Sequence, residues 1–171
     1  NIFEKTNFGI KMFKSGAEIW NNEFDEIFTP PSSAFNSVYG TAIYLNNDYN
    51  FWDRTLVVGE PTSSNSNILT NCKYGILGTG ECNYFIENNH FGSDNGTPTT
   101  GAISRSCISI EGAIKNNISI FNENKFYDFI KGITLYDIGE DVTLNITGNE
   151  FYDAIWSTPT MSYNATAISI M

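Results

Sequence analysis

The chain has 171 residues, a formal net charge of −10 at pH 7 and only nine Lys and Arg residues. This balance provides no basic stripe for phosphate groups, so we exclude nucleic acid as a partner. With 41% hydrophobic and 15% aromatic residues, the chain can bury the core of one domain. No apolar run approaches the ~20 residues that a membrane-spanning helix needs, so we expect no membrane span.

A short phrase, Asn followed by one variable residue and Phe, recurs along the chain. Four copies are clear, and two weaker copies begin with Thr. In chain order the six are Thr6/Phe8, Asn22/Phe24, Thr70/Cys72, Asn89/Phe91, Asn124/Phe126 and Asn149/Phe151. A second phrase, led by Gly or Ala and continued by alternating β-branched residues, follows most copies, at 40–45, 74–77, 101–104, 132–136 and 165–170. Both phrases have the period of β-strands.

The spacing of these phrases predicts a solenoid. No window sustains the helical pattern of apolar residues, and hairpins would need turn signals between adjacent strands. Equivalent residues of stacked coils lie ~4.8 Å apart, so Phe24, Phe91, Phe126 and Phe151 are expected to stack inside, with the Asn side chains bonded between coils. The predicted fold class is all-β: a single right-handed parallel β-helix of about six coils spanning residues 1–171.

The Asn-x-Phe and Gly-Ile-x-Leu phrases resemble the repeats of right-handed parallel β-helix proteins of the pectin-lyase-like class, which is common among secreted bacterial proteins. The resemblance implies a secreted or cell-surface location. Polygalacturonase-like members carry paired Asp residues, Gly-His-Gly and Arg-x-Lys, and this sequence contains none of the three. We therefore favour a non-catalytic module of a larger protein, acting as scaffold, adhesin or glycan-binding surface. The alternative is a carbohydrate-active enzyme, a lyase or hydrolase acting on acidic polysaccharide.

Asp128 and Asp153 are the weak catalytic candidates. Both stand two residues after the Phe of a repeat, where other copies have Glu26 and Ser93. Two carboxylates in adjacent coils repel unless a cation or Lys131 lies between them, so the pair could raise one pKa or hold calcium. The favoured interpretation is two solvated turn aspartates on the outside of neighbouring coils, with no metal and no cofactor.

Three segments between the two phrases are expanded, at 25–39, 92–100 and 152–164. A solenoid would place them on one side, where insertions often form a binding face. Trp156, Tyr163, Phe28 and Phe35 in these segments are candidate residues for stacking on sugar rings. The alternative is that they pack against neighbouring loops.

His90 and the three cysteines have mainly structural interpretations. His90 occupies the variable position of its phrase and is expected to face solvent without a role. Cys72 occupies a Phe position, and Cys107 begins a strand, so both are expected to be small buried residues. A Cys72–Cys82 disulfide remains an open alternative.

Neither end of the sequence has the features of a solenoid cap. The first residues already carry repeat positions, and the last segment, 165–171, alternates without charge or proline. Solenoids need caps to block pairing at their open ends. We therefore expect this chain to be part of a longer one, or its ends to be covered by a partner chain; a glycan is the other expected partner.

Overall fold

The computed structural model describes residues 1–27, 38–47, 54–60, 66–93, 106–112, 118–139, 142–153, 157–158, 161–162 and 165–171. These residues form strands and no helix. Sheet A contains β1 (Ile2–Glu4), β4 (Glu23–Asp25), β7 (Ile68–Leu69), β10 (His90–Phe91), β13 (Lys125–Phe126) and β16 (Glu150–Phe151). Sheet B contains β2 (Phe8–Phe13), β5 (Thr41–Asn47), β8 (Tyr74–Gly80), β11 (Ser106–Glu111), β14 (Lys131–Tyr136) and β19 (Thr166–Ile170).

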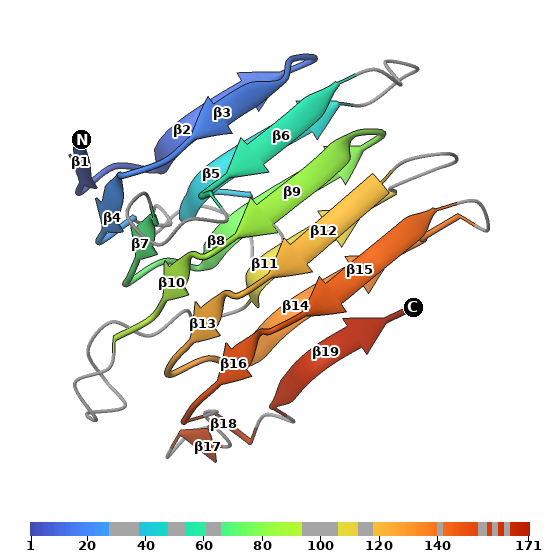
Figure 1. Cartoon of the computed structure of the whole chain (residues 1–171). Coiled ribbons are helices and arrows are strands. Elements are labelled where there is room, and N and C mark those ends of the chain that lie inside the picture. Colours follow the sequence, from blue (N-terminus) through green and yellow to red (C-terminus); the bar gives the residue numbers. More distant parts are fainter. Residues whose placement is uncertain are drawn as a thin grey trace.

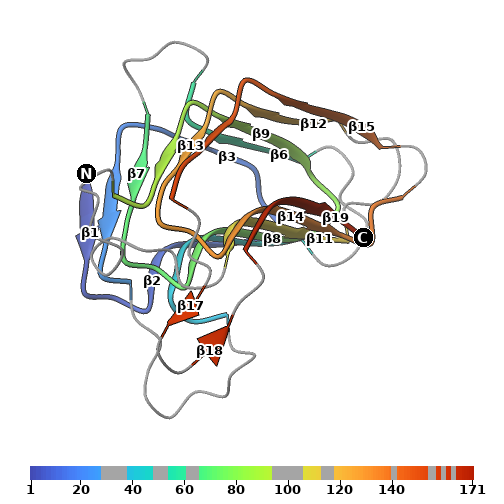
Figure 2. The same cartoon turned by 90° about the horizontal axis from the view of Figure 1, so that it is seen from below.

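Sheet C contains β3 (Ala17–Ile19), β6 (Thr55–Val58), β9 (Asn83–Glu87), β12 (Ile118–Asn122) and β15 (Thr143–Thr147). Within each of the three sheets, neighbouring strands pair in parallel. The chain passes from sheet A to B to C and then begins the next coil, so the strands stack down the molecule (Figure 1). Viewed along the stack, sheets B and C face each other and sheet A closes one side (Figure 2). This arrangement confirms the predicted parallel β-helix of about six coils.

The repeated Phe residues form a column inside sheet A. Phe24, Phe91 and Phe126 are completely buried, and Phe151 in the last coil is partly exposed. The rings of Phe91 and Phe126 stack with their centroids 5.0 Å apart, and those of Phe126 and Phe151 stack at 4.7 Å. The Phe of the repeated phrase therefore has a packing role, as the sequence predicts.

A column of small residues in sheet B makes room for these rings. Its members, related by strand register, are Gly9, Ala42, Gly75, Cys107, Gly132 and Ala167. A Cβ atom added at Gly75 would lie 2.7 Å from Cδ1 of Phe91, and one at Gly132 would lie 2.6 Å from Cε1 of Phe151. The Phe column opposite therefore restricts the first position of the second phrase to small residues.

The repeated Asn residues form a hydrogen-bonded column at the bend between sheets C and A. The side-chain Nδ2 of Asn89 donates to Oδ1 of Asn124 at 3.1 Å and to the carbonyl of Val58 at 2.8 Å. The backbone N–H of Asn89 also donates to Oδ1 of Asn124, at 3.0 Å. The backbone N–H groups of Asn22, Asn67 and Asn124 each donate in the same way to the Asn of the next coil. Each side chain therefore satisfies polar groups that the strands leave unpaired at the bend.

The prediction that Phe8 and Cys72 belong to the Phe column is wrong, because the strand register places other residues there. Phe3 pairs with Phe24, while Phe8 lies in β2 of sheet B. Leu69, preceded by Asn67, pairs with both Phe24 and Phe91, while Cys72 forms a bridge with Ile27 three positions further along the coil. In the first coil, Asn1-Ile2-Phe3 is itself a complete copy of the phrase. In the third coil, Leu69 fills the Phe position adequately, so the Asn column decides the register.

The corners between sheets are made by residues with left-handed backbone. The position two after the Phe column has a positive φ at Lys5, Glu26, Asn71, Asp128 and Asp153, with values of 47–53°. Non-glycine residues rarely adopt this conformation, and Asn and Asp tolerate it best. The position of the two candidate aspartates is therefore a turn position.

Part of the outer face of sheet B is buried. Tyr44, Tyr74 and Leu77 on this face are buried and pack together, and Ser109 and Thr134 in the same column as Tyr44 are 2% and 1% exposed. The hairpin of β17 (Ser157–Thr158) and β18 (Met161–Ser162), which belongs to the third expanded segment, lies on this outer side near the last coil (Figure 2).

Candidate functional site

The outer face of sheet A and the corner that follows it carry the polar and aromatic side chains of the repeat. One column precedes the Phe position: Ile2, Glu23, Ile68, His90, Lys125 and Glu150. A second column follows it: Glu4, Asp25, Thr70, Gly92, Tyr127 and Tyr152. Because strands β7, β10, β13 and β16 have only two residues each, the second column leads directly into the corner.

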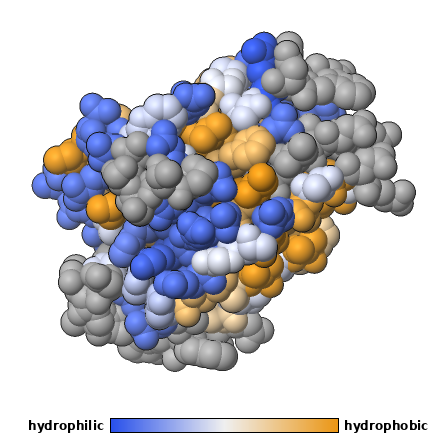
Figure 3. Space-filling model, viewed as in Figure 1, coloured by the Kyte–Doolittle hydropathy of each residue, from blue (hydrophilic) through white to orange (hydrophobic). Residues whose placement is uncertain are grey.

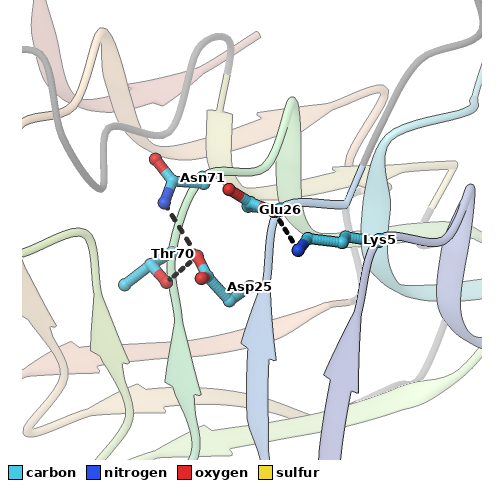
Figure 4. Close-up of polar contacts among 5 residues, drawn as sticks. All are labelled: Lys5, Asp25, Glu26, Thr70 and Asn71. Carbon is cyan, nitrogen blue, oxygen red and sulfur yellow. Dashed lines mark hydrogen bonds and ion pairs between the residues drawn. The ribbon is translucent and has the colours of Figure 1, made fainter.

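In the N-terminal coils, charged and polar side chains of this corner bind one another (Figure 4). Oδ1 of Asp25 accepts hydrogen bonds from Oγ1 of Thr70 at 2.8 Å and from Nδ2 of Asn71 at 2.7 Å. Nζ of Lys5 lies 3.8 Å from Oε2 of Glu26, in an exposed ion pair that contributes little to stability. These contacts run along the stack, from one coil to the next.

At the C-terminal coils three aromatic rings stack on the outside. The His90 and Tyr127 centroids are 4.7 Å apart, and those of Tyr127 and Tyr152 are 4.8 Å apart. The Tyr152 hydroxyl donates to Oε2 of Glu150 at 2.7 Å, which raises the pKa of that phenol, and Lys125 lies 3.7 Å from the same oxygen. His90 lies on the outer face of sheet A, as expected, but it is only partly exposed because its ring stacks on Tyr127.

This aromatic stack was missed at the sequence level. Tyr127 and Tyr152 both follow the Phe of a repeat, in the sequence Phe-Tyr-Asp, so the repeated tyrosine was the available signal. Stacking on a sugar requires an open ring face. The faces of Tyr127 are occupied by His90 on one side and by Tyr152 on the other, so this ring packs against the protein itself.

Asp128 and Asp153 occupy the same corner position of adjacent coils, but their environments differ. Asp128 is 2% exposed, and its Oδ2 has no hydrogen-bond partner, whereas Asp153 is exposed. Burial, together with the neighbouring Asp153 carboxylate, raises the pKa of Asp128. The expectation that both side chains are solvated is therefore wrong for Asp128, because it lies in an inner coil and Asp153 in the last coil of sheet A.

Lys131 does not separate the two carboxylates. Its Nζ donates to the hydroxyl of Tyr136 at 3.4 Å. Among the residues that the structure describes, no group of three or more His, Cys, Asp or Glu side chains could hold a metal ion. Even if each binds through both oxygens, Asp128 and Asp153 supply at most four of the six to eight oxygen ligands that calcium takes.

The four aromatic candidates for glycan binding, Trp156, Tyr163, Phe28 and Phe35, lie outside the described residues. Their role stays a prediction. Across the described residues there is also no helix long and apolar enough to cross a membrane.

The three cysteines are buried free thiols. Burial raises the pKa of Cys82 to about 12 and raises the pKa values of Cys72 and Cys107 well above their ordinary value. A buried thiol with a raised pKa is neither a nucleophile nor a metal ligand at neutral pH. The expectation of small buried residues is confirmed for Cys72 and Cys107, and no Cys72–Cys82 bridge forms.

No protein-family model, curated protein or solved structure matches this chain.

Proposed function

We propose that this chain is a non-catalytic β-helix module of a larger secreted or cell-surface bacterial protein, where it acts as a rigid scaffold. The observation that carries this proposal is that the side chains on the outer face of sheet A engage one another along the stack. Asp25 binds Thr70 and Asn71, and Tyr127 is held between two other rings. Side chains used in this way stiffen the solenoid. The net charge of −10 supports an exterior protein that must stay soluble.

As a scaffold, the module would display the segments between sheets A and B on one side. An adhesin or glycan-binding role would rest on those segments, where Trp156 and Tyr163 stand in the sequence. The resemblance to pectin-lyase-like repeats supports this proposal, because that class is common among secreted proteins. Affinity electrophoresis in gels that contain acidic or neutral polysaccharides tests the binding role, with Trp156→Ala and Tyr163→Ala as variants.

The catalytic role is tested by incubating the purified chain with polygalacturonate and alginate, with and without calcium. A lyase would release unsaturated products that absorb in the ultraviolet, and a hydrolase would release reducing ends. We expect neither. Turnover by the wild-type chain in any of these reactions would overturn the proposal of a non-catalytic module.

One observation favours the alternative, a carbohydrate-active enzyme. The raised pKa of Asp128 beside a second carboxylate is an arrangement that general acids use. If turnover is found, Asp128→Asn tests the assignment, and Asp137→Asn serves as control. Asp137 is an exposed aspartate with the same left-handed backbone, at φ 54°, in another corner. Loss of turnover in Asp128→Asn alone would establish the enzyme.

A further inference from the structure

Sheet C carries an apolar stripe on its outer face. In β6, β9 and β12, the residues that point into the core are completely buried, and side chains alternate between the two faces. The outward residues Val57, Phe85 and Ile120 are partly exposed. The register pairs Val57 with Phe85 and Phe85 with Ile120, so the three side chains form one column. Figure 3 shows apolar surface running across β6, β9 and β12.

The stripe lies within the stack. Each of β6, β9 and β12 pairs with a strand of sheet C on both sides, so coils added at either end of the stack would leave the stripe unchanged. Among the described elements, the β17–β18 hairpin lies outside sheet B, and none lies against the outer face of sheet C (Figure 2). Apolar surface with a polar border is typical of an interaction site.

Carboxylates border the stripe on the side toward sheet A. Glu87 ends β9, and Glu123 lies in the corner after β12, where its φ is 53°. Neither forms an ion pair with a Lys or Arg of the described chain. Burial raises the pKa of Glu87, a hydrogen bond with Asn122 partly offsets this, and the charge of Glu123 raises it further. A cation placed beside the stripe would relieve this repulsion.

The opposite border of the stripe is uncharged. There, Thr55 pairs with Asn83 at the start of β6 and β9. A partner for this surface therefore presents an apolar row with positive charge along one side of it. A second copy of this chain does not fit, because it would bring the same carboxylates to the contact. The net charge of −10 adds to that repulsion.

The spacing of the stripe favours a helix over an extended strand. Neighbouring strands lie ~4.8 Å apart, so the three outward side chains span ~10 Å. Three apolar residues on successive turns of an α-helix span ~11 Å, because the pitch is ~5.4 Å. Three residues on one face of a strand span ~13 Å, because every second residue shares that face. A strand would also place unpaired backbone groups against the apolar side chains, whereas a helix pairs its own.

We propose that the outer face of sheet C binds a basic amphipathic helix of a separate partner protein, which lies along the axis of the solenoid. One apolar residue per turn covers Val57, Phe85 or Ile120, and Lys or Arg residues beside them pair with Glu87 and Glu123. A separate protein supplies the helix, because this chain has only nine Lys and Arg and its described residues form no helix. The contact is independent of what the segments between sheets A and B bind.

A synthetic peptide provides the probe. It consists of Leu, Lys and Ala and has about 18 residues, which gives a helix of adequate stability in water. Leu recurs once per turn, and Lys lies along one side of the Leu row. A control peptide has the same composition in an order that forms no apolar row. Fluorescence anisotropy at low salt should show that the whole chain binds the first peptide about tenfold more tightly than the control. Equal affinities, or no binding at millimolar peptide, would overturn the proposal.

Phe85→Ser tests the stripe, because Phe85 lies at its centre. This variant should weaken binding of the Leu–Lys peptide by about tenfold. Ile68→Ser is the matched control: Ile68 is 44% exposed and lies on the outer face of sheet A, so binding should not change. Circular dichroism checks that both variants fold, and Ile120→Ser replaces Phe85→Ser if that variant does not. Full affinity after the loss of either stripe residue would refute the contact.

The carboxylates are tested with a pair of double variants of equal net charge. Glu87→Gln combined with Glu123→Gln should weaken binding by about three- to tenfold at low ionic strength and reduce its salt dependence. Glu23→Gln combined with Glu111→Gln removes two exposed carboxylates from β4 and β11 and should have little effect. Equal losses in the two double variants would show attraction to the net charge of the chain alone, and would overturn the proposed contact.

Discussion

Where the chain bends between two strands, its backbone groups lose their hydrogen-bond partners in the neighbouring strand. Side-chain amides at the bend can replace those partners. Asn89 is 1% exposed and bonds to Asn67, Asn124 and Val58 in three different coils. Its loss leaves several buried donors and acceptors unpaired at once. The Asn of the repeated phrase is therefore required for the fold, independently of any chemistry.

We predict that Asn89→Ala lowers the free energy of unfolding in urea by about 2–4 kcal/mol. Asn149→Ala, at the partly exposed end of the same column, should cost about 1 kcal/mol because water can replace the lost bonds. Equal effects at the two positions would show that the column does not act through buried hydrogen bonds.

Asp128 should make stability depend on pH with a definite sign. Its pKa in the folded chain lies above the ordinary value of 3.8, because burial and Asp153 oppose the charge. A carboxyl group whose pKa is higher in the folded than in the unfolded chain stabilises the fold while it is protonated. This stability is fully present below pH 3.8 and is lost as the pH rises through the pKa of the folded chain.

The neutral variant Asp128→Asn should therefore melt at a higher temperature than the wild type at pH 7, and at the same temperature near pH 3. Thermal unfolding followed by circular dichroism measures both. Asp137→Asn, at an exposed corner, controls for the loss of one negative charge. A variant that is less stable at pH 7 would show that the Asp128 carboxylate is paired in solution.

At the scale of the element, strands are positioned by what faces them across the core. The small-residue column of sheet B and the Phe column of sheet A are complementary in volume, so neither can change alone. A Cβ at Gly75 would lie 2.6 Å from the carbonyl oxygen of Cys107 and 2.7 Å from Phe91. Since backbone atoms cannot yield, this column accepts only small residues.

We expect Gly75→Ala to lower the free energy of unfolding by about 2–3 kcal/mol through this overpacking. Gly112→Ala separates the steric cost from the cost of backbone conformation. Gly112 has φ +72°, but an added Cβ meets no atom closer than 3.8 Å, so only about 1 kcal/mol should be lost. Urea titration of the two variants would contradict this explanation if the order of their losses were reversed.

The strands and their stacking were predictable from sequence, because Phe and Asn repeat in the phrase itself. The register of the third coil was not, since Leu69 fills a Phe position and the Thr70 phrase competes with it. The register of the first coil was predictable, because Asn1-Ile2-Phe3 is a complete copy of the phrase. The contrast between Asp128 and Asp153 was also not predictable. Two residues with the same local sequence differ in burial because one lies in an inner coil and the other in the last coil of sheet A.

At the scale of the whole molecule, a solenoid transmits order only between neighbouring coils. Its stiffness therefore depends on continuous columns. The Asn column runs from the first coil to the last, and the Phe column does so with Leu69 in place of Phe in the third coil. This continuity supports a scaffold role, since a rigid array can hold its loops at fixed positions.

The central claim is that the repeated Asn-x-Phe phrase builds the scaffold, and amide hydrogen exchange tests it most directly. The backbone N–H groups of Asn22, Asn67, Asn89 and Asn124 lie at bends and are bonded only to side chains of the next coil, while that of Asn149 lacks such a partner in the described chain. By NMR, the account predicts slow exchange at Asn67, Asn89 and Asn124 and fast exchange at Asn149. Fast exchange at all of these bends, with the strands protected, would contradict it.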